Sequence, residues 1–488
     1  MTTAPHTIAI RLGDASWTYN ELELVSRQIA ACLINDHGNL KGKCIAFMVD
    51  PGFDYVSVLH GIGLAGAIAV PLCLTHPLPA LQYVIEDTQT KVIIASSAYI
   101  ECLSEHCSAN SIRLMRVDEA KREDVTIFPK MMQSDPAMIL YTSGTTNKPK
   151  GVVLTHGNLI AQMDKLIDAW KWTAADHTLC VLPLHHVHGI VNVVGCALRS
   201  KAQLEFLPVF SAEQVFECFK KGNINVFMAV PTIYYKLIAH FESLASEEQQ
   251  QLTAVMKKFR LMVCGSAALP VSIMEKWEGI SGQRLLERYG MTEIGMGISN
   301  PYTGERRAGH VGQPLPGVQV RLVDDSFNDV ASGEPGEILV KGDNVFAAYW
   351  NKPEETQQAF TKDGWFKSGD VAVLDKGYYK IIGRNSIDII KSGGYKISAL
   401  EIEEVLRTHE SVSDCAVVGI PDEEWGERVV VALVGKPSAS TEEIVNWLKT
   451  QLPTYKTPKR YLWLEELPRN AMGKVVKAEV KKLFKHSS

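Results

Sequence analysis

The first half of the chain alternates short apolar runs with longer segments in which apolar residues recur every three or four positions. The short runs predict buried strands at 44–49, 92–95, 137–140 and 179–182. After residue 155, one helix face is predicted by Leu159, Met163, Leu166, Ile167 and Trp170. The alternation continues with strands at 226–229, 260–263 and 285–289, and it is typical of parallel sheets covered by helices.

The pattern changes between about residues 300 and 382, where glycine and proline separate short strand-like runs. Strands are predicted at 318–323, 337–340, 371–374 and 378–382. Asp375, Lys376 and Gly377 predict a hairpin turn between the last two of these. This part of the chain is therefore expected to form a smaller β-rich subdomain.

From Ser398 predicted helices and strands alternate again. Ser398 and Glu401 predict a capping box, and Ile402, Val405 and Leu406 form the apolar stripe of the helix that it starts. Strands at 416–420, 429–434 and 461–464 and a helix at 441–452 complete a small α+β unit. The expected fold is α/β, with an N-terminal domain at 1–383 of two helix-covered sheets plus the β-rich subdomain at 300–383. A hinge at 384–388 and a small α+β C-terminal domain at 389–488 follow.

Composition narrows the class of protein. The 488 residues are 46% hydrophobic and 22% charged, which is ordinary for a globular protein. A net charge of -5 gives no reason to expect nucleic acid, and ten cysteines without a Cys-x-x-Cys pair argue against disulfides or structural zinc. Residues 1–11 lack a targeting pattern, and the longest apolar run, 61–74, is interrupted by Pro71. We therefore expect a soluble, cytoplasmic protein that does not bind membranes.

The loop at 141–151 is the first candidate for chemistry. It places hydroxyls, glycines and lysines between two apolar runs, where side-chain and backbone donors would converge on an anion such as a nucleotide phosphate. Pro149 stands where a Walker loop needs its Gly-Lys-Ser/Thr sequence, so this is not that motif. A polar surface turn would also fit the same residues.

Six further motifs follow the loop in order. They are residues 182–186 (LPLHH), 265–269 (GSAAL), 289–293 (YGMTE), 365–370 (WFKSGD), 383–384 (GR) with 392–396 (SGGYK), and 468–474 (PRNAMGK). With the loop at 142–151 they resemble the adenylate-forming superfamily of acyl-CoA synthetases, luciferases and peptide-synthetase adenylation domains, over about residues 10–480. The resemblance implies a ligase of fatty acid metabolism that uses ATP, Mg²⁺ and coenzyme A, as a monomer or homodimer. In that chemistry a carboxylate attacks the α-phosphate of ATP, so cations and donors must offset the repulsion.

The resemblance also implies roles for individual residues. Glu293 would bind Mg²⁺ and Thr292 the α-phosphate, although Glu293 could instead be a carboxylate at a helix N-terminus. Asp370 would accept the ribose hydroxyls beside Arg384, although an isolated Asp in this sequence could be a turn residue. The full nucleotide set would be Thr142, Ser143, Gly144, Thr145, Thr146, Lys150, Gly265, Ser266, Ala267, Ala268, Glu287, Tyr289, Gly290, Met291, Asp370 and Arg384.

The C-terminal motifs imply the remaining steps. Lys474 would bridge carboxylate and α-phosphate, unless it is an ordinary surface lysine. The small domain would then turn about the hinge, where this chain has Ser386 instead of the usual Asp or Lys. That motion would present Gly393, Gly394 and Lys396 to coenzyme A.

His186 matches the residue that gates the acyl pocket. A metal site made by His185, His186 and His188 is disfavoured, because alternate side chains of an extended segment face opposite ways and no carboxylate lies beside them.

The choice of acid depends on Arg288, which directly precedes Tyr289. A fixed guanidinium there would bind a second carboxylate, with Lys236 and His188 as further substrate residues, unless Arg288 forms a structural pair with Glu287. The sequences around Arg288, Arg306 and Tyr349 resemble malonyl- and methylmalonyl-CoA synthetases. Malonate is favoured over aryl, succinylbenzoate or medium-chain acids. The sequence also leaves open a loader of a separate carrier protein and a non-catalytic relative.

Overall fold

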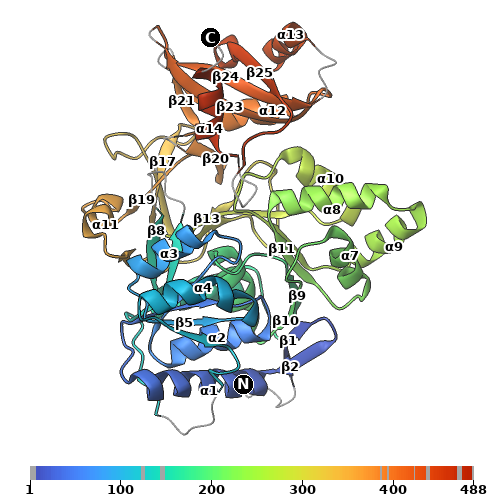
Figure 1. Cartoon of the computed structure of the whole chain (residues 1–488). Helices are drawn as coiled ribbons and strands as arrows, with labels where there is room; N and C mark the ends of the chain where they lie inside the picture. The colour runs from blue at the N-terminus through green and yellow to red at the C-terminus, as the bar shows by residue number, and fades with distance from the viewer. Residues whose placement is uncertain are drawn as a thin grey trace.

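Four β-sheets organise the chain in a computed structural model, which describes residues 7–121, 127–142, 149–384, 387–392, 395–422, 424–435, 440–469 and 475–485. The two larger sheets and their helices form the lower body in Figure 1. The C-terminal sheet forms a smaller unit at the top, and the four-stranded sheet lies between that unit and the body.

The seven-stranded sheet has a parallel centre that is buried on both faces. Its order is β18 (Ala348–Tyr349), β8 (Lys150–Thr155), β7 (Pro136–Thr142), β4 (Ile68–Pro71), β3 (Cys44–Met48), β5 (Val92–Ala95) and β6 (Arg113–Arg116). Alternate residues of β3 enter two different cores: Ile45 and Phe47 pack with α1 (Tyr19–His37) and α2 (Phe53–Leu64), whereas Ala46 and Met48 pack with α3 (Leu78–Asp87) and α4 (Ser97–Ala109). Helices on both faces explain why these strands read as continuous apolar runs.

The nine-stranded sheet shares the first of those cores. Its order is β15 (Gln313–Pro314), β14 (Gly295–Ser299), β13 (Leu286–Met291), β12 (Leu261–Cys264), β11 (Val226–Ala229), β9 (His177–Cys180), β10 (Gln203–Phe206), β1 (Ile8–Leu12) and β2 (Ala15–Thr18). One face contacts the shared core through α5 (His156–Ala169), the π-helix η1 (His188–Gly195) and α6 (Cys196–Arg199). The other is covered by α7 (Ala212–Lys220), α8 (Pro231–Ser243), α9 (Ser246–Met256) and α10 (Val271–Ser281).

The four-stranded antiparallel sheet confirms the predicted β-rich region. It consists of β16 (Gln319–Val323), β17 (Gly336–Lys341), β19 (Phe366–Asp375) and β20 (Tyr378–Arg384), with α11 (Pro353–Ala359) before β19. Lys376 and Gly377 both have positive φ angles, 47° and 83°, as a type I′ turn requires. The predicted hairpin is therefore present.

The C-terminal unit begins after β20. Its sheet contains β21 (Ile389–Ser392), β22 (Tyr395–Ser398), β23 (Val412–Asp422), β24 (Gly426–Gly435) and β25 (Arg460–Leu464), packed with α12 (Ala399–Leu406), α13 (Thr441–Gln451) and α14 (Lys477–Lys485). The hinge expected at 384–388 falls between β20 and β21, and Ser386 lies outside the described residues.

Two details of the predicted elements are corrected. Strand β9 ends at Cys180, two residues before the predicted end, because buried Val181 and Leu182 leave the sheet to start the loop that carries the histidines. Only half of the predicted capping box forms at α12. The Ser398 side chain accepts from the Glu401 amide at 3.2 Å, whereas the Glu401 carboxylate pairs with Lys456 at 2.7 Å. The ammonium of Lys456 competes successfully for that carboxylate.

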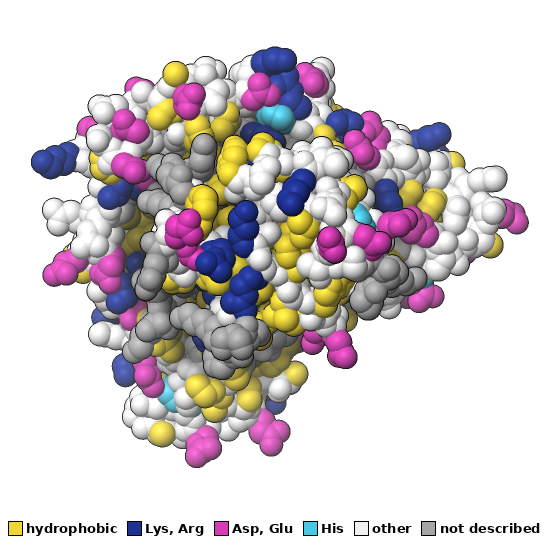
Figure 2. All heavy atoms as spheres, turned by 90° about the horizontal axis from the view of Figure 1, so that it is seen from above, with side chains coloured by type: hydrophobic (Ala, Val, Ile, Leu, Met, Phe, Trp, Pro, Cys, Tyr) yellow, Lys and Arg dark blue, Asp and Glu magenta, His cyan; other side chains and the backbone are white. Residues whose placement is uncertain are grey.

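Viewed from the C-terminal unit, basic side chains gather near the middle of the visible face, with acidic side chains placed among and around them (Figure 2). Within the described ranges, no helix combines the length and apolar character needed to cross a membrane.

Candidate active site

Residues from three sheets meet where β13 ends. Tyr349 of β18 donates its hydroxyl to Glu293 at 3.0 Å, which joins the seven-stranded sheet to the nine-stranded one. Tyr289 of β13 donates to Asp370 of β19 at 2.6 Å, which joins the nine-stranded sheet to the four-stranded one. The carboxyl ends of sheet strands are where open α/β folds bind ligands.

The predicted phosphate loop connects β7 to β8. Thr142 and Lys150 are paired across these antiparallel strands, so they fix the two ends of the loop. The Lys150 ammonium lies 5.1 Å from the centre of the Tyr349 ring. Ser143, Gly144, Thr145 and Thr146 lie outside the described residues, so their role stays a prediction.

Glu293 is a buried carboxylate with an exposed fraction of only 6%. It lies in the short turn between β13 and β14, which rules out a carboxylate at a helix N-terminus. Burial raises its pKa, and the hydrogen bond from Tyr349 opposes that shift. Among the described residues one side chain donates to this carboxylate, and a carboxylate oxygen is the kind of ligand that a hard cation such as Mg²⁺ prefers.

Side chains from other segments form hydrogen bonds with the turn that carries Thr292 and Glu293 and with the start of β14. The Asn344 side chain donates to Ile294 O at 2.6 Å, and Gln162 of α5 accepts from the Met296 amide at 2.9 Å. Gly295 has a φ of 58°, and a Cβ at this position would lie only 2.1 Å from Gln162 Oε1. Glycine therefore leaves the room that the Gln162 side chain occupies. Thr292 and both of these amide side chains line a small cavity beneath the turn.

The predicted ribose residues lie side by side. Asp370 and Arg384 face each other in the register of β19 and β20, with the guanidinium Nε 3.5 Å from the carboxylate. Asp370 lies within β19, so it is not merely a turn residue. The second carboxylate oxygen of Asp370 accepts the Tyr289 hydroxyl.

The predicted adenine residues follow β12. Ser266, Ala267 and Ala268 are exposed, and Ser266 has a φ of 70°, an uncommon conformation for a residue with a side chain. Glu287 beneath them is buried and accepts from the Leu269 amide at 3.1 Å, while its other oxygen has no partner within the described chain. Burial, assisted by nearby Glu404, raises the pKa of Glu287 to about 8. Burial therefore favours the protonated form of Glu287.

This shift predicts a pH dependence of stability. Between the ordinary carboxyl value and pH 8 the folded state keeps the Glu287 proton while the unfolded state loses it. The free energy of unfolding therefore falls with rising pH, by about 1.4 kcal/mol per unit, and levels off above pH 8. Glu287→Gln removes this contribution, so its melting temperature should decline less between pH 5.5 and 8 than that of the unmodified protein. Identical declines in a thermal melt would contradict the prediction.

Arg288 is the most buried cation of the site, with an exposed fraction of 3%. One guanidinium nitrogen donates to Ser266 Oγ at 3.3 Å, and Nε has no partner among the described residues. A Cβ on Gly265 would lie 2.6 Å from the guanidinium carbon, so only glycine allows the side chain to lie here. Burial lowers the pKa of Arg288 to about 10, which leaves it charged at neutral pH.

No carboxylate pairs with this charge in the part of the chain that the structure describes. Neighbouring Glu287 accepts the Leu269 amide and, among those residues, makes no direct ion pair with Arg288, although each group influences the pKa of the other. An unpaired buried charge is costly unless an opposite charge joins it. The site therefore calls for an anion at Arg288.

His188 lies near this guanidinium. His188 begins η1, is 5% exposed, and its Nδ1 lies 3.1 Å from Ser266 Oγ. Burial, followed by the charge of Arg288, holds the pKa of His188 well below its usual range, and burial lowers the pKa of His186 to about 4. Both are neutral at physiological pH. No group of three His, Cys, Asp or Glu that could hold a metal occurs in the described ranges.

Of the remaining predicted residues, only Lys236 is described with its side chain, and it is not brought into this cluster. Lys236 is exposed on α8, with its ammonium 5.8 Å from the centre of the Phe210 ring. Gly393, Gly394 and Lys474 lie outside the described residues, and Lys396 is placed only by its backbone, on β22. Their roles stay predictions. Tyr349, Gln162 and Asn344 were not predicted, because their contacts join segments that are far apart in the sequence.

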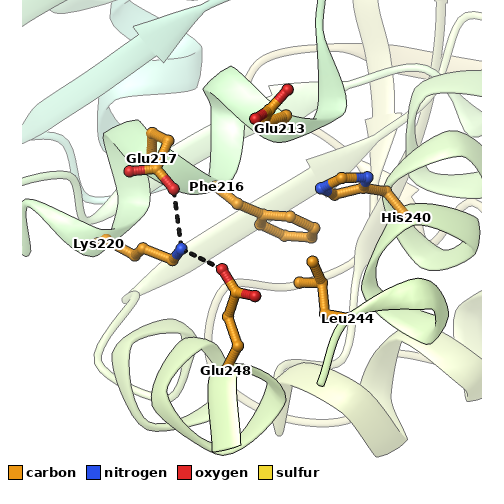
Figure 3. A pocket seen from close by; sticks show the side chains of 7 residues that line it. All are labelled: Glu213, Phe216, Glu217, Lys220, His240, Leu244 and Glu248. Carbon is orange, nitrogen blue, oxygen red and sulfur yellow. Dashed lines mark hydrogen bonds and ion pairs between the residues drawn. The ribbon is translucent and has the colours of Figure 1, made fainter. Parts of the chain in front are cut away.

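A separate surface pocket lies among the outer helices α7, α8 and α9 (Figure 3). Lys220 is its one lysine, and its ammonium is paired with Glu217 at 2.8 Å and Glu248 at 2.6 Å. Phe216 and His240 stack on the other side of the pocket. Because the lysine is already neutralised, the pocket offers no second anion site.

Known proteins are similar to this chain over most of its length. The AMP-binding enzyme family matches residues 1–350, and the AMP-binding enzyme C-terminal domain matches residues 401–474. The chain is similar to the mitochondrial malonate–CoA ligase ACSF3 of Bos taurus, with 43% identity over 96% of this chain and 87% of that protein.

Two solved structures are similar to this chain over nearly its whole length. ATP-bound MatB from Rhodopseudomonas palustris has a TM-score of 0.92 at 30% identity, covering 100% of this chain and 97% of that one. A malonyl-CoA ligase product complex with methylmalonyl-CoA and AMP has a TM-score of 0.71 at 36% identity, covering 96% and 98%. The overall arrangement is therefore nearer to the ATP-bound structure, although the product complex is more similar in sequence.

Proposed function

The chain belongs to the AMP-binding enzyme family of adenylate-forming acyl-CoA synthetases, and on that premise we propose that it joins malonate or methylmalonate to coenzyme A. ATP would be cleaved to AMP and pyrophosphate in the same reaction. Relatives named malonate–CoA ligase support this choice of acid.

The buried, unpaired guanidinium of Arg288 carries the proposal. A dicarboxylate has one carboxylate to activate and a second to pair with Arg288, and a fork-shaped guanidinium can bind that group with two parallel hydrogen bonds. Ser266 Oγ and His188 lie against the same guanidinium and provide further polar contacts. A long-chain fatty acid would instead place apolar carbons against a buried charge, which is unfavourable.

The first half-reaction needs charge stabilisation. One oxygen of the substrate carboxylate forms a bond to the α-phosphorus of ATP, while the bond from that phosphorus to pyrophosphate breaks. Thr292 would donate to the α-phosphate, and Lys150 and Lys474 would supply positive charge. Asp370 and Arg384 would fix the ribose.

The buried carboxylate of Glu293 suits a magnesium ion, because it is ionisable and has one side-chain donor beside it. When bound, Mg²⁺ would neutralise phosphate charge that builds up in the reaction.

In the second half-reaction the coenzyme A thiolate attacks the acyl carbonyl carbon, and the bond to AMP breaks. His186, which is neutral at physiological pH, would line the path of the thiol. Gly393, Gly394 and Lys396 are our candidates for contacts with coenzyme A.

A single assay tests the proposal. Pyrophosphate release is measured with malonate, methylmalonate, succinate, acetate, octanoate and benzoate, each with and without coenzyme A. We expect the highest kcat/KM with malonate or methylmalonate, and acyl-CoA formation only when coenzyme A is present. Faster turnover of octanoate or benzoate would refute the dicarboxylate assignment, and transfer to a carrier protein in preference to coenzyme A would refute the ligase assignment.

A further inference from the structure

Tyr349 connects two parts of the nucleotide site that come from different sheets. Its hydroxyl lies 3.0 Å from Glu293 Oε1, and its ring faces the Lys150 ammonium at 5.1 Å. Glu293 follows β13 of the nine-stranded sheet, whereas Lys150 starts β8 of the seven-stranded sheet. One side chain therefore contacts both the carboxylate and the cation.

The backbone fixes where Tyr349 lies. It pairs with Val152 in the register of β18 and β8, two residues from Lys150. The Tyr349 amide donates to Thr356 Oγ1 at 2.9 Å, and its ring packs on Phe346 with ring centres 4.8 Å apart. These contacts set the direction of the phenol before any ligand arrives.

The same segment also holds the main chain of Glu293. The Phe346 amide donates to Glu293 O at 2.7 Å, so residues 346 and 349 hold the backbone and the side chain of one residue. Mere packing would need only the aromatic ring. The hydroxyl is explained by what it does to the carboxylate: it donates to Oε1 and so fixes the direction in which the carboxylate points.

We propose that Tyr349 is a positioning residue, which orients the Glu293 carboxylate toward the metal-nucleotide complex and keeps Lys150 beside it. The proposal rests on the proposed role of Glu293 toward the divalent cation. A partner that orients a metal-binding carboxylate typically changes metal affinity by about 10- to 100-fold when it is removed.

The test is cation binding, without turnover. Mn²⁺ is titrated into protein saturated with ATP in the absence of any acid, and free Mn²⁺ is measured by electron paramagnetic resonance. Tyr349→Phe keeps the ring and loses the hydroxyl, so we expect about 10-fold weaker Mn²⁺ binding with an unchanged melting temperature. Tyr349→Leu also loses the ring beside Lys150, so it should in addition weaken ATP binding measured by calorimetry without metal.

The matched control is Tyr378→Phe. Tyr378, on the hairpin of β19 and β20, also donates its hydroxyl at 3.0 Å, but to the Glu305 carbonyl. This variant should bind Mn²⁺ as the unmodified protein does. Equal Mn²⁺ affinity for Tyr349→Phe and Tyr378→Phe would overturn the proposal, and so would a Tyr349→Phe protein whose weaker binding is matched by a lower melting temperature. Because no acid is present, the result does not depend on which acid the enzyme activates.

Discussion

Replacing Arg288 with alanine should reduce kcat/KM for malonate roughly 30- to 1,000-fold, which is a loss of about 2–4 kcal/mol in transition-state stabilisation. The variant leaves the second carboxylate of malonate without a partner in a site from which water is largely excluded. Acetate has no second carboxylate, so its slow turnover should be unaffected. The measurement is the ratio of kcat/KM for malonate to that for acetate, obtained from pyrophosphate release.

Two further variants make this result interpretable. Arg288→Lys keeps the charge but loses the fork, and it should recover only part of the activity. Arg284→Ala removes a guanidinium two residues before β13 that pairs with Glu278 at 2.5 Å, and it should leave the ratio unchanged. If Arg288→Ala lowers kcat/KM equally for both acids, Arg288 has a structural role and the dicarboxylate assignment fails.

Replacing Lys474 with alanine should slow adenylate formation by about 10²- to 10³-fold, because the attacking carboxylate and the α-phosphate would lose a cation between them. Transfer of the acyl group from supplied malonyl-AMP to coenzyme A should proceed at the normal rate, since no phosphate bond forms in that step. The two half-reactions are measured separately, as pyrophosphate release and as thioester formation.

Lys482→Ala is the control for this experiment. Lys482 is an exposed lysine of the following helix, where it pairs with Glu479 at 2.7 Å, and its loss should affect neither half-reaction. Loss of both half-reactions in Lys474→Ala would show that the variant is misfolded or that Lys474 has another role.

Much of the fold could be predicted because the pattern of apolar residues is locally determined. Strands β5 and β11 have the predicted bounds, since each is a short apolar run buried on both faces. The hairpin after β19 was recognisable from the sequence Asp375, Lys376 and Gly377, and in the structure the last two of these have positive φ angles. The end of β9 was not, because Val181 and Leu182 are as apolar as the strand and are buried without being paired.

The site was predictable only where one short motif carries its chemistry. Asp370 and Arg384 lie in separate motifs, and the register of a hairpin brings them together. Tyr349 and Glu293 are 56 positions apart in the sequence, and the pairing of β18 with β8 brings them together. No local sequence pattern predicts that pairing. The sequence predicted Arg288 as a guanidinium for a second carboxylate, but its lack of an ion-pair partner among the described side chains is visible only in three dimensions.

The division of the site among three sheets has an evolutionary consequence. The groups proposed to recognise the acid, Arg288, Ser266 and His188, all belong to segments of the nine-stranded sheet, whereas the phosphate loop and the ribose pair Asp370 and Arg384 belong to the other two. Mutations in η1 can therefore change the acid-binding side without altering the phosphate loop or the ribose pair, whereas the turn after β12 also carries the predicted adenine residues. A lineage of such enzymes could diversify its substrates by exchanging the η1 segment, and the same segment is where a designer seeking a new acid should begin.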